Sequence, residues 1–134
     1  MMKKGTKILI GIMVVVVVLI AVVAISAKNI LNGKSEEMDH VPVVELQDVE
    51  DGVYEGIAET PLVKVTVEVT VQNHEIVDIQ LLRHENGKGE GAESMIPEML
   101  KQNTSEVDGV SGATFSSKTI KAAVRNALSK GKIN

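Results

Sequence analysis

One uncharged apolar run restricts how this chain can fold more than any other feature of its sequence. The run is ILIGIMVVVVVLIAVVAISA, Ile8 to Ala27, and it extends for 20 residues without a charge. At about 1.5 Å per residue, a helix of this length matches a hydrocarbon core roughly 30 Å thick. Three lysines and no acidic residue lie among the seven residues before it. By the positive-inside bias, we expect a transmembrane anchor over 8–27, with residues 1–7 cytoplasmic and the remainder outside.

A cleaved secretory signal is the alternative interpretation of this run. Its apolar region would span only about 7–15 residues and would end at small residues, as Ser26 and Ala27 do here. The observed run is longer, which favours an uncleaved anchor. The chain has no cysteine, which excludes a lipoprotein anchor, cysteine-ligated metal or iron–sulfur sites, and disulfides.

The charge beyond the anchor is strongly negative. All 18 acidic residues lie after Ala27 but only 11 of the 14 basic ones, which gives that portion a formal charge of −7. Nucleic-acid binding domains carry basic patches, and single-strand binders add aromatic stacking platforms. This chain has one Tyr and one Phe. We therefore expect no nucleic-acid partner.

Residues 28–51 have the composition of an acidic tether. They hold seven acids and two lysines, with little periodicity. The segment is either a docking strip for a partner or, as we favour, a solvated spacer between the membrane and a folded domain. The folded domain is then expected over 52–134.

Alternation of apolar and polar residues predicts a sheet in this domain. In LVKVTVEVTV, residues 62–71, the valines fall on one face and Lys64, Thr66, Glu68 and Thr70 on the other. The sequence QNHE is typical of a turn, and Ile76 to Leu82 resumes the pattern with Val77, Ile79 and Leu81 facing inward. DGVYEGIAE, beginning at Asp51, predicts a shorter strand before them. We therefore expect an α+β fold with a small antiparallel sheet of three or more strands, packed by helices and preceded by one transmembrane helix.

Two segments predict the covering helices. Residues 90–103 have apolar side chains at helical spacing, but Pro97 interrupts the pattern, so a broken or restarted helix is expected there. The second segment has one apolar stripe with i, i+3, i+4, i+7 and i+8 spacing, formed by Ile120, Ala123, Val124, Ala127 and Leu128. Lys118, Lys121 and Arg125 lie off this stripe, and Gly131 is placed to end the helix.

The stretch VDGVSGATFSSKTIKAAV, residues 107–124, joins these two helices through a turn rich in glycine and hydroxyl side chains. Gly109 and Gly112 can adopt positive φ, and Ser116 or Ser117 can cap the second helix. Amides that converge on a helix start, together with the helix dipole, favour a phosphate. The residues alone leave two alternatives: an ordinary helix cap, or an anion cradle with a nucleophilic hydroxyl inside it.

The sequence DGVSGATFSS resembles the signature of the FMN-binding domain family, found in the C subunit of the sodium-translocating NADH:quinone reductase and the G subunit of the Rnf complex. In that family a flavin transferase attaches FMN through its phosphate to the threonine of an S/T-G-A-T motif, and it recognises an aspartate three residues before the motif. The resemblance implies a phosphoester of FMN on Thr114, recognition through Asp108, and a flavin-binding turn formed by Ser111, Gly112, Ala113, Thr114 and Ser116.

The resemblance covers about 80 residues in the family's order, from DGVYEG through the hairpin and LLRHENGKGEG to the last helix. It departs from the family at Asn86, where a hydroxyl side chain is usual, so the resemblance does not imply a flavin contact from this loop. The resemblance implies a membrane-anchored, extracytoplasmic electron carrier or redox-complex subunit more than a stand-alone enzyme. Its expected partners are a flavin transferase and a membrane oxidoreductase or quinone-linked electron donor. A flavin-holding scaffold and a non-redox interaction domain remain as alternatives.

The three histidines are not at metal-ligand spacing, so no metal site is expected. His40, in the tether, and His74, in the hairpin turn, are expected to be solvated. His84 ends the second strand of the hairpin. It either has a structural or exposed role, which we favour, or contacts the flavin ring or a phosphate oxygen.

Overall fold

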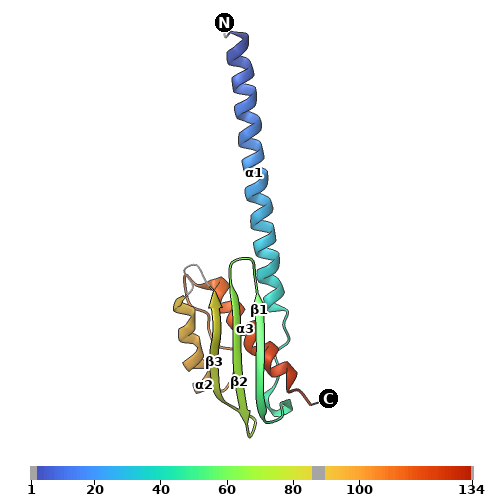
Figure 1. Ribbon diagram of the computed structural model, residues 1–134, viewed down its shortest axis with the longest axis vertical. Coiled ribbons are helices and arrows are strands. Elements are labelled where there is room, and N and C mark those ends of the chain that lie inside the picture. The colour runs from blue at the N-terminus through green and yellow to red at the C-terminus, as the bar shows by residue number, and fades with distance from the viewer. Residues whose placement is uncertain (1–2, 86–89, 134) are drawn as a thin grey trace. The chain divides into compact units, whose positions relative to one another are not determined.

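The computed structural model describes residues 3–85 and 90–133. These residues form two compact units, Met1–Gly33 and Lys34–Asn134, and each is described by itself. The elements in chain order are α1 (Lys4–Asp39), the 3-10 helix η1 (Leu46–Asp48), β1 (Gly52–Glu59), β2 (Lys64–Gln72), β3 (Glu75–Glu85), the 3-10 helix η2 (Glu90–Ser94), α2 (Met95–Gln102) and α3 (Thr114–Lys130) (Figure 1).

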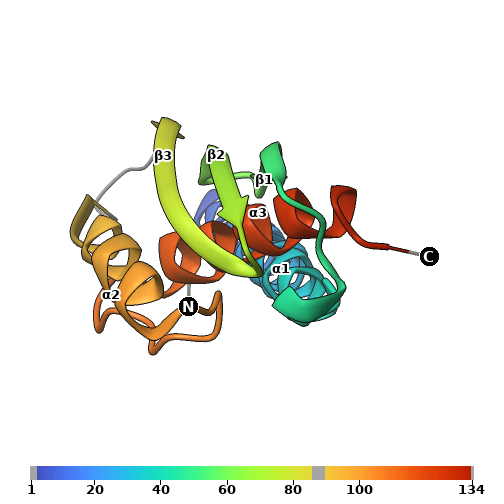
Figure 2. The same ribbon diagram turned by 90° about the horizontal axis from the view of Figure 1, so that it is seen from below.

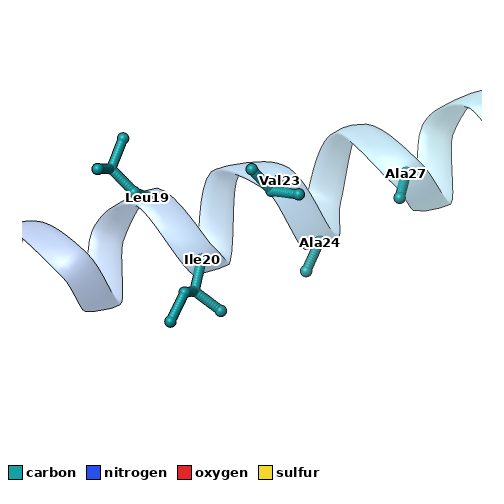
Figure 3. Close-up of a pocket in the computed structure, with 5 residues that line it drawn as sticks. All are labelled: Leu19, Ile20, Val23, Ala24 and Ala27. Atoms are coloured by element: carbon teal, nitrogen blue, oxygen red, sulfur yellow. The ribbon is translucent and has the colours of Figure 1, made fainter.

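The first unit is the apolar part of α1. Lys4–Ile30 forms a 27-residue stretch with a mean hydropathy of 3.6 and none of its most apolar window buried, so by length and composition it could cross a membrane. Among the described residues it is the one candidate span. Figure 3 shows five of its side chains, which contain only carbon: Leu19, Ile20, Val23, Ala24 and Ala27. The predicted apolar helix is therefore present.

The second unit is an antiparallel sheet in the order β1-β2-β3, with α3 packed across one face and α2 beside β3 (Figures 1 and 2). The alternation in β2 determines this arrangement, because Val65, Val67, Val69 and Val71 are fully buried. The residues between them are partly exposed on the other face. The α+β class and the three-stranded sheet are confirmed.

Two irregularities in the pairing of β2 with β3 alter the predicted inward face of β3. The register shifts between Thr66 and Val67, and again between Thr70 and Val71. A bulge inserts an extra residue and reverses the side-chain alternation beyond it. The side chain of Ile76 is consequently 4% exposed and that of Val77 46% exposed, so the prediction that Val77 faces inward was wrong.

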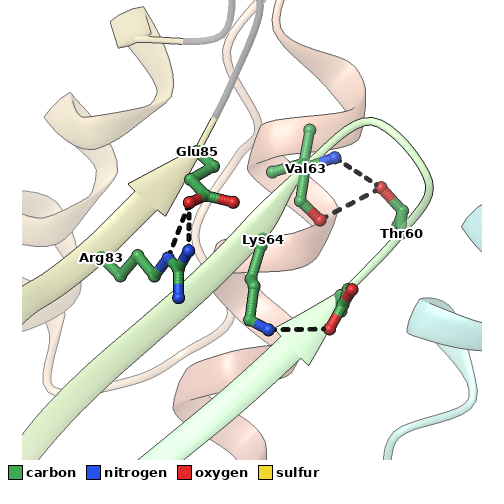
Figure 4. A network of polar contacts seen from close by, with 6 residues as sticks. Thr60, Val63, Lys64, Arg83 and Glu85 are labelled. Carbon is green, nitrogen blue, oxygen red and sulfur yellow. Dashed lines mark hydrogen bonds and ion pairs between the residues drawn. The ribbon is translucent and has the colours of Figure 1, made fainter.

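The turns of the sheet follow local chemistry. Asn73 and His74, between β2 and β3, both have positive φ, as a two-residue hairpin turn requires. Between β1 and β2, Thr60 Oγ1 accepts hydrogen bonds from the amides of Leu62, at 3.3 Å, and Val63, at 3.0 Å. Figure 4 shows this turn beside the Lys64–Glu59 and Arg83–Glu85 ion pairs that border the same end of the sheet.

The sheet and α3 pack closely because β1 carries a glycine where the helix crosses it. A Cβ atom on Gly56 would lie 1.9 Å from the carbonyl oxygen of Ala123 and 2.7 Å from the amide nitrogen of Ala127. Only a residue without a side chain fits there. The predicted apolar stripe of α3 is confirmed, since all five of its members are buried. Its predicted end is also confirmed, with Gly131 as the residue after the helix.

Two other expectations were met only in part. The helical segment over 90–102 does restart near Pro97, but two residues before it: η2 ends at Ser94 and α2 begins at Met95, which leaves Pro97 in the first turn, where a missing N–H removes no internal bond. The segment expected as a tether is helical as far as Asp39 and then packs on the domain. Met38, Val44 and Val49 from this segment belong to the buried core of the second unit.

Candidate functional site

The motif SGAT lies in a turn that precedes α3. The amide of Ala113 donates to the carbonyl oxygen of Val110 at 3.0 Å, which closes a four-residue turn. Gly112 has a φ of +80° at the third position of this turn, a conformation that glycine adopts at little cost. The expectation for Gly112 is confirmed. The same expectation for Gly109 was wrong, because Gly112 is the glycine with positive φ among the described residues.

The helix begins at the predicted flavin acceptor, Thr114, and not at the serines that follow it. Ala113 is the N-cap residue, and no side chain caps the helix. The amide of Ser117 donates to the carbonyl oxygen of Ala113 at 2.9 Å, which is the first bond of the helical ladder. The prediction that Ser116 or Ser117 caps the helix was therefore wrong. The amides of the first turn precede that first bond and remain at a helix start without a side-chain cap, a favourable environment for an anion.

Ser117 instead fixes the turn to the helix. Its hydroxyl accepts a hydrogen bond from the amide of Val110 at 2.9 Å. Gly109 approaches the same side chain so closely that a Cβ on it would lie 3.2 Å from Ser117 Cβ. These two contacts of Ser117, with Val110 and Gly109, hold the DGVSGAT turn against the first turn of α3. Thr114 lies in the chain between Val110 and Ser117.

Ser116 belongs to a hydrogen-bonded network of side chains that the sequence analysis did not predict. His84 Nε2 lies 3.1 Å from Ser116 Oγ, and His84 Nδ1 lies 2.8 Å from Glu93 Oε1. The His84 side chain is 2% exposed and that of Glu93 42%. A carboxylate at Nδ1 favours the proton on that nitrogen, so in the neutral ring Nε2 accepts from the serine hydroxyl. These side-chain contacts connect the end of β3 and η2 to the first turn of α3.

A cavity of about 350 Å³ opens beside Thr114. Thr114, Lys118 and Lys121 line it from α3, where spacings of four and three residues place them on one face of the helix. Ser111 lines it from the turn, and Asp39 from the end of α1. Lys118 Nζ lies 2.5 Å from Asp39 Oδ2. The cavity therefore presents an exposed hydroxyl, a helix start and two ammonium groups together.

Glu106 and Arg125 fix the loop that leads into the motif. Arg125 Nε lies 2.7 Å from Glu106 Oε1, and Nη2 lies 2.5 Å from Oε2. The Arg125 guanidinium holds the pKa of Glu106 below its ordinary value of 4.5, and a hydrogen bond from Ser105 adds to this lowering, while burial opposes it. Arg125 Nη1 also donates to the carbonyl oxygen of Val41 at 3.3 Å. Arg125 is thus buried, although the helical pattern placed it off the apolar stripe.

The remaining predicted residues lie as follows. Asp108 is exposed, three residues before Ser111. His40 and His74 are exposed, and Nδ1 of His74 lies 3.1 Å from the carbonyl oxygen of Leu46. Asn86, where the sequence departs from the resemblance, lies outside the described residues. Within the described residues, no group of three or more histidine or acidic side chains could hold a metal ion.

Comparison with known protein families identifies the module. The FMN-binding domain model matches residues 63–129, which is half of the chain. The chain belongs to the FMN-binding domain family. The matched part of this FMN-binding domain runs from the start of β2 to the last turn of α3 and includes the whole SGAT turn. β1 lies before the match but pairs with β2 along its length. No curated protein matches the chain.

The residues beside Thr114 fit the phosphate of FMN. The helix start has no side-chain cap, the threonine is exposed, and two lysines line the same cavity. The sequence analysis assigned neither Lys118 nor Lys121 to the site, although their distances of four and seven residues from Thr114 would have placed them there. Asp39 gave no such signal, because it lies 79 residues from Lys118 in the chain.

Proposed function

We propose that this protein is a membrane-anchored, extracytoplasmic flavoprotein that carries FMN covalently on Thr114 for electron transfer. The observation that carries the proposal is the position of Thr114. Its exposed side chain is the first of α3, at a helix start with no side-chain cap, and it lines a cavity with two lysines. A hydroxyl that merely capped the helix would belong to the residue before the helix, and here that residue is Ala113.

The surrounding residues would hold the phosphate and leave the hydroxyl accessible. A phosphodiester on Thr114 keeps one negative charge. The amides at the start of α3, the helix dipole, and the ammonium groups of Lys118 and Lys121 compensate that charge. Ala113 adds only a methyl group beside the acceptor, and Gly112 adds no side chain. The approach to the Thr114 oxygen is thus uncrowded at the two preceding residues.

Attachment requires a flavin transferase and an activated flavin nucleotide as donor. In the balanced step, the Thr114 oxygen forms a new bond to phosphorus, the bond from phosphorus to the donor's leaving group breaks, and the hydroxyl proton is lost. Asp108 is exposed, so it is accessible for recognition by the transferase. Ser116 and Ser117 are buried and already hydrogen-bonded to His84 and Val110, which makes them poorer acceptors than Thr114.

The electron chemistry would belong to the flavin, and the chain would supply its position. The anchor Lys4–Ile30 would keep the carrier beside a membrane oxidoreductase or quinone-linked donor. Three lysines precede or begin this helix on its N-terminal side, which supports placing the FMN-binding domain outside the cytoplasm. A covalent bond suits that location, because a cofactor released there has no cytoplasmic pool from which to rebind.

The test is loading of the full chain by a flavin transferase during co-expression, read by intact mass and by in-gel fluorescence after denaturation. Thr114→Val keeps the shape of the side chain and removes the oxygen, so it should abolish the added FMN mass. Thr114→Ser keeps the hydroxyl and should load in part. Ser111→Ala is the matched control, because Ser111 is an exposed hydroxyl residue lining the same cavity, and it should still load. Full loading of Thr114→Val would refute the assignment, and absence of FMN from the wild type would refute the function.

A further inference from the structure

The cavity beside Thr114 holds one acidic side chain from a distant part of the sequence. Asp39 is the last residue of α1 and follows the apolar segment by nine residues. Its carboxylate pairs with Lys118, one helical turn after Thr114, at 2.5 Å. Asp39, Lys118 and Thr114 all line the cavity. The Asp39 carboxylate, from the segment that follows the apolar helix, therefore forms an ion pair with Lys118, the basic residue nearest in sequence to Thr114.

We propose that Lys118 exchanges partners when flavin is attached: it pairs with Asp39 in the unloaded protein and with the phosphate of FMN in the loaded protein. The exchange would loosen the last turn of α1 at Asp39, where it contacts α3. The loading state of Thr114 would then be transmitted to the segment that joins the domain to the membrane anchor. This inference rests on the proposed function.

The geometry supports competition between the two anions. Residues four apart on a helix are neighbours on its surface, so a phosphate bonded to Thr114 lies within reach of the Lys118 ammonium. Asp39 shows that an oxyanion is accepted there. The existing pair is weak, because the side chains of Lys118 and Asp39 are 31% and 55% exposed. A phosphate fixed by a covalent bond has a high effective concentration at Lys118, so it should displace the carboxylate.

Loss of this pair matters to α1 because its last turn has no basic residue of its own. The C-terminal end of a helix carries a partial negative charge, and acidic side chains such as Asp39 are unfavourable there. Lys118 supplies the missing cation from α3. When the phosphate takes Lys118, the last turn of α1 loses that compensation and should open more often.

Hydrogen exchange on the full chain in detergent micelles tests the proposal. Wild-type protein made with and without a flavin transferase is compared, and intact mass establishes which samples carry FMN. In peptides that cover residues 34–44, loading should raise the amide exchange rate about 2–5-fold, the factor expected for loss of an exposed ion pair.

The lysine variants make the outcome specific to Lys118. Lys118→Met should exchange quickly in both states, with no further response to loading, and Lys118→Arg should retain the response. Lys101→Met is the matched control, because Lys101 has the same charge but is exposed on α2 and is not part of the cavity lining, and its response to loading should persist. An unchanged exchange rate in wild-type protein of full FMN mass, or a response that persists in Lys118→Met, would overturn the exchange of partners alone. A wild type without FMN mass would overturn the proposed function.

Discussion

The ion pair between the buried Arg125 and the more exposed Glu106 gives the sharpest test of how the loop before the motif is held. Glu106→Gln keeps the shape of the side chain but removes its charge. One of the two arginine hydrogen bonds, with donor–acceptor distances of 2.7 and 2.5 Å, then faces an amide NH₂ group that cannot accept it. Hydrogen bonds to charged groups contribute about 1.5–3 kcal/mol each. Breaking a fully buried pair costs about 3–5 kcal/mol.

The Glu106 side chain is 34% exposed and that of Arg125 only 9%. Losing the pair should therefore cost about as much as one hydrogen bond to a charged group, and less than breaking a fully buried pair. We expect Glu106→Gln to lower the free energy of unfolding by about 2–3 kcal/mol at pH 7. For a unit of this size, that corresponds to a fall in Tm of about 10–20 °C. Urea unfolding of the full chain in detergent, followed by the fluorescence of Tyr54, measures it. Tyr54 is the only tyrosine, and the chain has no tryptophan.

The pH dependence of the same variant separates charge from shape. The pKa of Glu106 is lowered in the folded state, so its stabilisation is complete above the ordinary value of 4.5 and is lost as pH falls through the folded pKa. The stability difference between wild type and Glu106→Gln should therefore shrink as pH drops below 4.5. Glu85→Gln is the matched control, because its partner Arg83 is exposed, and it should change stability by less than about 0.5 kcal/mol. Equal effects of the two variants at pH 7 would refute the reasoning.

Three further predictions concern packing, recognition and orientation. Gly56→Ala should lower the stability of the domain by more than about 3 kcal/mol in the same urea assay, because its Cβ would overlap the backbone of Ala123 and Ala127; a loss below 1 kcal/mol would show that β1 and α3 separate easily. Asp108→Ala should prevent flavin loading by mass and leave the unfolding midpoint unchanged, because the side chain is exposed; full loading would contradict its role in recognition. Protease added to intact cells should remove the FMN-binding domain and spare a cytoplasmic control; protection of the domain would reverse the proposed topology.

The sheet and the last helix could be predicted from the sequence because their signals are local. The β2 valines alternate strictly, and the stripe on α3 repeats at helical spacing, so each pattern identifies its buried face without knowledge of the partner. The turn at Asn73 and His74 and the end of α3 at Gly131 followed from neighbouring residues in the same way.

The errors fell where the outcome depended on contacts between elements. The inward face of β3 depends on two bulges that arise from pairing with β2, so Val77 was assigned to the wrong face. The serines after Thr114 were assigned to the cap, but Ser117 bonds to Val110 and Ser116 to His84. Neither partner can be identified from spacing along the chain.

The polar lining of the cavity beside Thr114 would make the proposed covalent bond more suitable than binding alone. Pockets that retain drug-sized ligands without a bond usually enclose about 300–1,000 Å³ and bury most of the ligand among apolar and aromatic side chains. The cavity beside Thr114 is near the lower limit, at about 350 Å³, and its lining includes two lysines, an aspartate and two serines. The chain has only one Phe and one Tyr with which to stack a flavin ring. A phosphoester on Thr114 would supply the retention that so few apolar contacts cannot, and it would leave the ring accessible to electron donors and acceptors.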